Sequence, residues 1–120
     1  MEAGSHARPR RKDSTVFHVY ARSIELIRAL RPLVGRLEKR DKDLARQLCR
    51  AASSIPLNIA EGNRRTGKDK SYHFRVAAGS AAETSAALEV AQAWGHLEDT
   101  SKALDLLDQI RAMLWTLSNR

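Results

Sequence analysis

Apolar residues recur at steps of three and four from residue 16 to residue 117, and this periodicity constrains the fold more than any other feature. A period near 3.6 residues places such side chains on one helix face, whereas a half-buried strand alternates every second residue. The pattern predicts an all-α fold of four helices. Their apolar stripes are Val16, Tyr20, Ile24, Ile27, Leu30, Val34 and Leu37; Leu44, Leu48, Ala51, Ile55 and Ile59; Phe74, Ala77, Ala78, Ala81, Ser85 and Leu88; and Ala103, Leu107, Ile110, Leu114 and Leu117.

Short polar segments separate the stripes, so consecutive helices must turn back on one another. Residues 38–43 are charged and predict a turn, in which Asp41 or Asp43 caps the second helix by accepting free backbone N–H groups. Residues 63–70 form a second, basic loop. With connections this short, we expect one domain over residues 15–120, an antiparallel up-down four-helix bundle.

Glycine and proline positions refine these helices. Pro32 lies inside the first stripe and predicts a kink, because proline removes a helical hydrogen bond. Gly62 is expected to end the second helix and Gly95 the third, since glycine readily adopts positive φ. Thr66, with Asp69 three residues later, resembles a capping box for the third helix.

Positive charge is concentrated in two segments. The chain has 21 Lys and Arg against 14 Asp and Glu, a net charge of +7. Residues 1–14 lack apolar periodicity and are expected to form a flexible basic arm. The arm with Glu2 and Asp13 carries +2 and the loop with Asp69 carries +3, which leaves +2 for the remaining body. The basic residues of the two segments are Arg8, Arg10, Arg11, Lys12, Arg64, Arg65, Lys68 and Lys70.

A charge of this kind points to an anionic partner. The first interpretation is that these eight residues bind RNA or DNA through phosphate contacts, without base readout, because few aromatic residues are free to stack. The second is an adaptor that docks an acidic protein. The third is that the arm and the loop are only solvated.

The third helix carries a second apolar stripe opposite its main one. Val76, Ala87, Val90 and Trp94 lie about 180° from the core stripe at 100° per residue. One four-helix core cannot cover both faces of a helix. We therefore expect these four residues to contact another subunit in a homo-oligomer.

A polar strip accompanies the apolar stripe of the second helix. Arg50, Ser54, Asn58 and Glu61 follow at steps of four, four and three. On the third helix, Glu83 is a candidate partner, and Ser80 is counted with the strip. Two interpretations remain open: a solvated face, or a hydrogen-bonding strip between helices or subunits that includes Arg50 and Glu83.

No pattern in the sequence predicts catalysis, a metal or a cofactor. The four histidines lack metal-ligand spacing, and residues 62–68 have no GKS or GKT ending of a phosphate-binding loop. No apolar run is long enough to cross a membrane. The single cysteine, Cys49, suits a reducing cytoplasm and is expected to be a buried or half-buried bystander.

The polar strip also carries a family resemblance. The run Arg50-Ala-Ala-Ser-Ser-Ile-Pro-Leu-Asn-Ile-Ala-Glu-Gly62, followed by Gly79-Ser80-x-x-Glu83, resembles the bacterial four-helix-bundle family whose founding members are encoded in intervening sequences of 23S ribosomal RNA genes. The accessory variability protein of diversity-generating retroelements is a relative. The resemblance extends from Val16 onward and implies an up-down bundle, a cyclic homopentamer, a basic surface for nucleic acid and no catalytic activity.

Overall fold

The computed structural model describes the backbone of residues 7–120 and the side chains of residues 14–120. Within this part of the chain there are four helices and no strand, so the all-α prediction is confirmed. The helices are α1 (Ala7–Glu38), α2 (Lys42–Asn63), α3 (Gly67–Ala93) and α4 (Ser101–Ser118).

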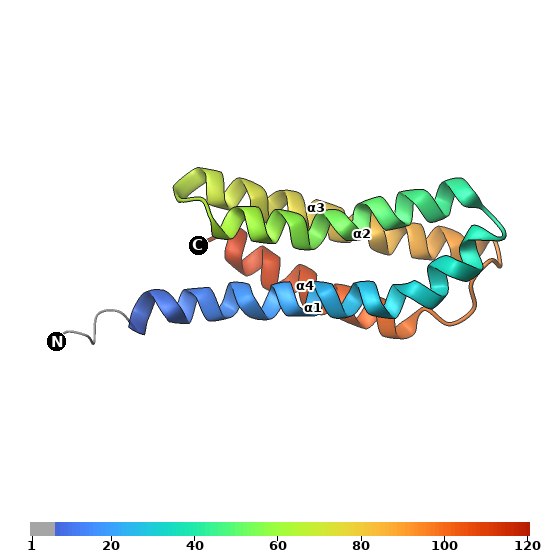
Figure 1. The fold of residues 1–120 in the computed structure, drawn as a ribbon, viewed down its shortest axis with the longest axis horizontal. Helices are drawn as coiled ribbons and strands as arrows, with labels where there is room; N and C mark the ends of the chain where they lie inside the picture. Colours follow the sequence, from blue (N-terminus) through green and yellow to red (C-terminus); the bar gives the residue numbers. More distant parts are fainter. Residues whose placement is uncertain (1–6) are drawn as a thin grey trace.

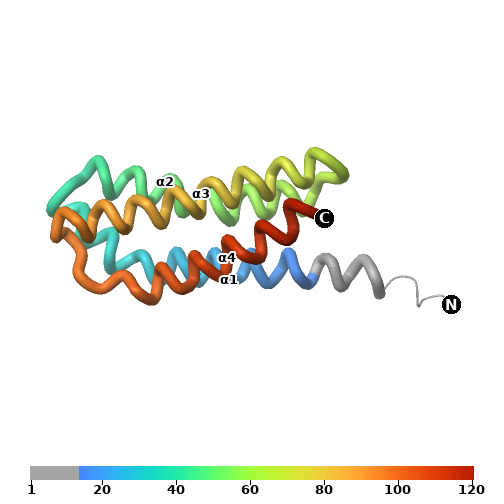
Figure 2. Tube along the Cα trace, turned by 180° about the vertical axis from the view of Figure 1, so that it is seen from behind, coloured from blue at the N-terminus to red at the C-terminus, as the bar shows by residue number. Residues whose placement is uncertain are grey.

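Each helix of the bundle packs against two others. α2 contacts α1 and α3, and α4 contacts α3 and α1. Figures 1 and 2 show the α1–α2 and α3–α4 connections together at one end of the molecule. The α2–α3 connection, the start of α1 and the C-terminus lie at the other end. The two ends therefore carry different sets of side chains.

The apolar stripes of α2 and α4 form the core as predicted. All five stripe residues of α4 are buried, as are Leu48, Ala51, Ile55 and Ile59 of α2. On α3, Phe74 and Leu88 are buried in the same core. Because α2 and α4 have one apolar face each, their periodicity alone was enough to identify the buried side.

The stripe predicted for α1 is wrong at four positions. Val19, Ser23, Leu26 and Leu33 are buried, whereas the following residue in each case is only half-buried or is exposed. Those less buried residues are Tyr20, Ile24, Ile27 and Val34. Burial of Ser23 is tolerated because its Oγ donates to the carbonyl oxygen of Tyr20 at 2.6 Å. The apolar face of α1 is wider than one stripe, and part of it faces outward.

The segment expected to be a flexible arm is partly helical, because α1 already begins at Ala7. Pro9 does not prevent this, since the N–H groups of a first helical turn have no intrahelical partner. The side chains of Arg8, Arg10, Arg11 and Lys12 lie outside those that the structure describes. The remaining six residues of the arm also lie outside the described backbone.

Three predictions about helix ends and bends, at Asp41, Pro32 and Gly95, are confirmed. Asp41 caps α2, and its Oδ1 accepts from the backbone N–H of Leu44 at 3.0 Å. Past Pro32, the last turns of α1 bend away from its earlier axis, as expected (Figure 1). Gly95 ends α3 with φ of 79°, and the N–H of His96 donates to the carbonyl of Ala91 at 2.9 Å. This geometry is that of a Schellman motif.

Two other predictions of helix ends are wrong. Thr66 makes no side-chain cap, and the Asp69 carboxylate accepts from Arg65 instead of completing a capping box. Gly62 does not stop α2 with a positive φ; it is buried inside the last turn, and α2 continues to Asn63. A Cβ at position 62 would lie 2.7 Å from Cε1 of Phe74, so this glycine allows α2 and α3 to approach closely.

Candidate nucleic-acid interface

The basic loop (residues 63–70) projects from the end of the bundle at which α1 begins (Figure 1). Arg64, Arg65 and Lys68 are exposed. Lys70 is half-buried, and its Nζ lies 5.8 Å from the centroid of the Phe74 ring. The structure therefore brings all four predicted loop cations to one end of the molecule.

Arg65 is the most constrained of these cations. Its Nε donates to Glu61 Oε2 at 2.8 Å and its Nη1 to Asp69 Oδ2 at 2.6 Å. Arg64 lies farther from Glu61, with Nη1 3.7 Å from Oε1. Because Glu61 reaches the loop from α2, the loop with Glu61 and Asp69 carries +2 instead of the +3 expected from sequence. Arg64, Lys68 and Lys70 are freer than Arg65 to contact an anion.

The ion pairs also shift the pKa values of Glu61 and Arg65. The hydrogen bond from Arg65 holds the pKa of the Glu61 carboxyl below its ordinary value of 4.5, and the hydrogen bond to Glu61 raises the pKa of Arg65. A carboxylate with a lowered pKa in the folded state stabilises the fold above its unfolded pKa. That contribution is lost as the pH falls through the lowered, folded-state value.

Glu61→Gln should therefore make the fold less sensitive to acid. We expect the urea midpoint of the wild type to fall more than that of Glu61→Gln when the pH drops from neutral to below the lowered pKa that Glu61 has in the folded state. The control is Glu89→Gln, because Glu89 is exposed and makes no ion pair with another described residue. It should keep the wild-type dependence. The prediction would be contradicted if the urea midpoints of Glu61→Gln and of the wild type fell by the same amount over this pH range.

Three residues of the predicted polar strip form a hydrogen-bonded connection between α2 and α3. Ser80 Oγ donates to Ser54 Oγ at 2.7 Å, and Asn58 Nδ2 donates to Ser54 Oγ at 3.0 Å. Sequence reasoning missed two further members. The Nδ1 of His73 lies 3.2 Å from Asn58 Oδ1, and Thr84 Oγ1 donates to the carbonyl of Ser80 at 2.7 Å. The spacing of seven between His73 and Ser80 was the available signal.

Two charged residues of that strip, Arg50 and Glu83, do not join this connection within the protomer. Arg50 and Glu83 are both exposed, and neither makes an ion pair with another described residue. They therefore share no network between helices of the protomer, because both side chains lie on the outer faces of α2 and α3. A network between subunits stays a prediction. Only the uncharged residues of the strip point toward the helix–helix contact.

The predicted subunit interface on α3 is only partly available. Ala87 is already buried in the protomer core and Val76 is half-buried, because the second stripe of α3 borders α2. Val90 and Trp94 are 45% and 71% exposed. Ala87 is therefore excluded from a subunit interface, because it belongs to the protomer core, whereas contact of Val90, Trp94 and the accessible part of Val76 with another subunit stays a prediction.

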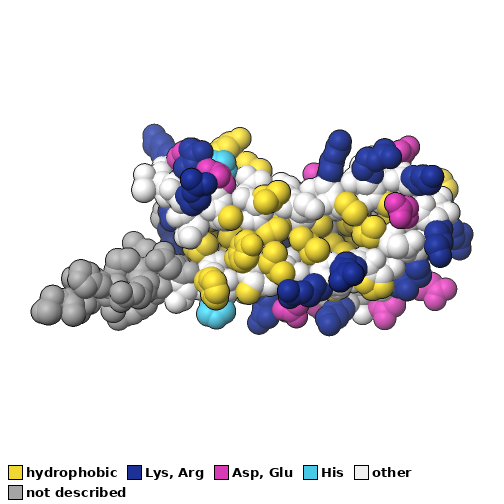
Figure 3. Space-filling view, in the orientation of Figure 1, with side chains coloured by type: hydrophobic (Ala, Val, Ile, Leu, Met, Phe, Trp, Pro, Cys, Tyr) yellow, Lys and Arg dark blue, Asp and Glu magenta, His cyan; other side chains and the backbone are white. Residues whose placement is uncertain are grey.

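A larger exposed apolar surface follows the junction of α1 and α2, as Figure 3 shows. Its residues include Phe17, Tyr20, Ile27 and Val34 of α1 and Leu57 of α2. A cavity of about 290 Å³ lies in the middle of this surface, between Ile27, Val34 and Cys49. The sequence analysis missed this surface because it placed the outer stripe of α1 in the core. Cys49 is a free, exposed thiol, so its expected burial is also wrong.

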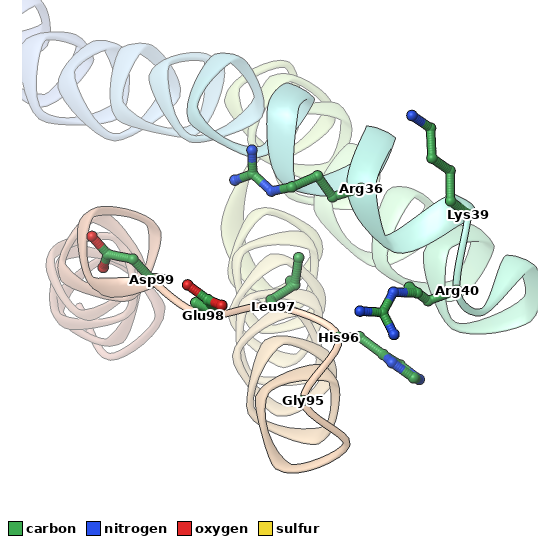
Figure 4. Close-up of a pocket in the computed structure, with 8 residues that line it drawn as sticks. All are labelled: Arg36, Lys39, Arg40, Gly95, His96, Leu97, Glu98 and Asp99. Carbon is green, nitrogen blue, oxygen red and sulfur yellow. The ribbon is translucent and has the colours of Figure 1, made fainter.

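The opposite end of the bundle holds a second group of cations. Arg36, Lys39 and Arg40 line a cavity of about 530 Å³ between the end of α1 and the α3–α4 connection. None of the three makes an ion pair with another described residue. Figure 4 shows the Arg40 guanidinium beside His96, whereas Lys39 extends away from the connection.

Acidic groups offset the charge of this second cavity. Glu98 and Asp99 line it with the three cations, so its formal charge is +1. Hydrogen bonds from the side chain and backbone of Ser101 lower the pKa of Asp99, which therefore remains a carboxylate. The Nδ1 of His96 is buried without a hydrogen-bond partner. The cavity is thus of mixed sign.

Two further observations concern residues 14–120. No group of three or more His, Cys, Asp or Glu side chains in this range could hold a metal ion. Among the described helices, none is sufficiently long and apolar to cross a membrane.

Comparison with known proteins gives one match. A family model described as 23S rRNA-intervening sequence protein matches residues 16–116. No curated protein and no solved structure matches the chain.

Proposed function

The chain belongs to the family of 23S rRNA-intervening sequence proteins, and from this premise we propose that it is a non-catalytic, homo-oligomeric bundle that binds nucleic acid through phosphate contacts. The observation that carries the proposal is the set of cations at one end of the molecule. Arg64, Lys68 and Lys70 belong to the basic loop, and α1 begins at the same end of the molecule (Figure 1).

The distribution of charge supports this proposal. The arm with Glu2 and Asp13 carries +2 and the basic loop with Glu61 and Asp69 carries +2, so these segments account for four of the seven net positive charges. At the opposite end of the bundle, the cavity is lined by both positively and negatively charged side chains. A phosphate chain is attracted to such a concentration of charge with little sequence preference, because the interaction releases condensed counterions.

Exposed apolar surface supports the oligomeric part of the proposal. Val90 and Trp94 on α3 and the α1–α2 surface are different patches on one protomer. Contact between two different patches is heterologous, and such contacts close into a ring when the rotation allows. The connections at alternating ends of the bundle in Figure 1 support an up-down-up-down protomer. We propose that five such protomers form the ring, as the family resemblance implies. The exposed thiol of Cys49 suits a reducing cytoplasm.

The salt dependence of RNA binding tests the proposal. The wild type should bind unrelated single-stranded RNAs with similar affinity, and log K should fall with log salt by about 0.7 per phosphate contact. Binding that is absent, or that does not respond to salt, would contradict it. Capture of one acidic protein without nucleic acid would instead support an adaptor. In the same preparation, light scattering should give a mass above that of the protomer, and a clean monomer at micromolar concentration would contradict the oligomer.

A further inference from the structure

Two aromatic side chains lie exposed on α1 next to the basic loop. Phe17 is 71% exposed and Tyr20 is 37% exposed. They are one helical turn apart, so they lie on the same side of α1. Sequence reasoning expected few aromatic residues to be free for stacking, and the structure shows two beside the predicted phosphate contacts.

These aromatic residues form one wall of a groove of about 460 Å³. Val16, Ile59 and Ala60 contribute its apolar lining, and Asn63 and Arg64 contribute polar groups from the end of α2. The volume falls within the range of pockets that hold small ligands, about 300–1,000 Å³. The groove thus combines aromatic rings, a side-chain amide and a guanidinium that also belongs to the basic loop.

This combination matches the chemistry of an unpaired nucleotide. A base has a flat π-face that stacks on Phe or Tyr, and its edge carries hydrogen-bonding groups that suit an amide. Its phosphate suits Arg64. In a duplex the π-faces are covered by neighbouring base pairs, so only an unpaired base can enter.

We propose that this groove stacks an unpaired base of a single-stranded nucleic acid whose phosphates contact the basic loop. The inference rests on the proposed function and narrows its substrate class from nucleic acid in general to single strands. Charge favours this occupant over a second copy of the chain, because Arg64 is the charged residue that lines the groove, no acidic residue lines it, and the phosphate of a nucleotide supplies the matching negative charge. The aliphatic part of the α1–α2 surface, around Ile27 and Val34, remains available for subunit contacts.

The test compares Phe17→Leu and Tyr20→Leu with the wild type on one oligonucleotide, presented single-stranded and as a duplex. Leucine keeps an apolar side chain at these exposed positions but removes the π-face. Each substitution should weaken single-strand binding by roughly 5- to 150-fold, the range for the loss of one stacked base. Duplex binding and the salt slope should not change, because the phosphate contacts remain. Tyr20→Phe should keep wild-type affinity.

Two controls separate stacking from other effects. Trp115, which is 69% exposed on α4, is an aromatic residue outside the groove, so Trp115→Leu should leave both affinities unchanged. The second control is a strand with abasic positions. The wild type should bind this strand as weakly as Phe17→Leu binds the intact strand. Phe17→Leu should bind the abasic strand no more weakly than the wild type does.

The outcomes distinguish this inference from the proposed function. If the wild type binds neither single strands nor duplexes, both fail. If it binds with the expected salt slope but Phe17→Leu and Tyr20→Leu bind single strands normally, only the base-stacking groove is overturned. Equal losses on single strands and duplexes, or a fall in oligomer mass on light scattering, would also overturn it and assign the groove to contacts between copies of the chain.

Discussion

Replacement of Arg64, Lys68 and Lys70 with alanine should weaken binding to unrelated single-stranded RNAs by about 100-fold at a salt concentration near 0.1 M. The estimate follows from counterion release, in which each lost phosphate contact removes about 0.7 from the salt slope. Three contacts correspond to about two units of slope, and hence about two log units of affinity at this concentration. Arg65 is kept because it links Glu61 to Asp69, and its loss would disturb the loop itself.

The opposite end of the bundle supplies a control with the same change in charge. Alanine at Arg36, Lys39 and Arg40 also removes three cations, but from the cavity of mixed sign. If phosphate binds at the basic loop, this variant should keep most of the wild-type affinity and slope. Equal losses in the two triple variants would mean that only net charge matters. Loss confined to the control would move the binding surface to the opposite end.

Gly62→Ala should lower the free energy of unfolding, because it overpacks the core, a change that usually costs about 1–3 kcal/mol. A Cβ at this position would lie 2.7 Å from Cε1 and 2.9 Å from Cδ1 of Phe74, and 3.2 Å from Cβ of His73. The Phe74 ring has little freedom to move aside, because it is only 2% exposed. The helix propensity gained by replacing glycine, at most about 1 kcal/mol, offsets only part of this cost.

Gly79→Ala is the matched control, and it should raise the free energy of unfolding instead of lowering it. A Cβ at position 79 would have no neighbour within 4 Å, and the residue lies in the interior of α3. Alanine should therefore stabilise the fold by about 0.5–1 kcal/mol. Urea denaturation at one fixed protomer concentration measures both variants, because the stability of an oligomer depends on concentration. Stabilisation of the fold by both substitutions would show that α2 and α3 do not approach closely at Gly62.

The number of helices, the capped start of α2 and the end of α3 could all be predicted from the sequence. Each depends on residues that are neighbours along the chain: apolar side chains at helical spacing, Asp41 three residues before the N–H that it caps, and Gly95 in its left-handed conformation. The basic loop could be predicted for the same reason, since Arg64, Arg65, Lys68 and Lys70 are nearly consecutive.

Only the tertiary structure decided which face of α1 is buried, what Gly62 does and which polar residues meet. The two stripes of α1 are offset by a single residue, and the helices packed against α1 select between them. Gly62 and Phe74 belong to different helices, as do Ser54 and Ser80. The exposure of Phe17 and Tyr20 beside Arg64 likewise follows from how α1 lies on α2. Helical periodicity describes one helix at a time, whereas these features are set by the distance and rotation between two helices, which depend on every side chain in their contact.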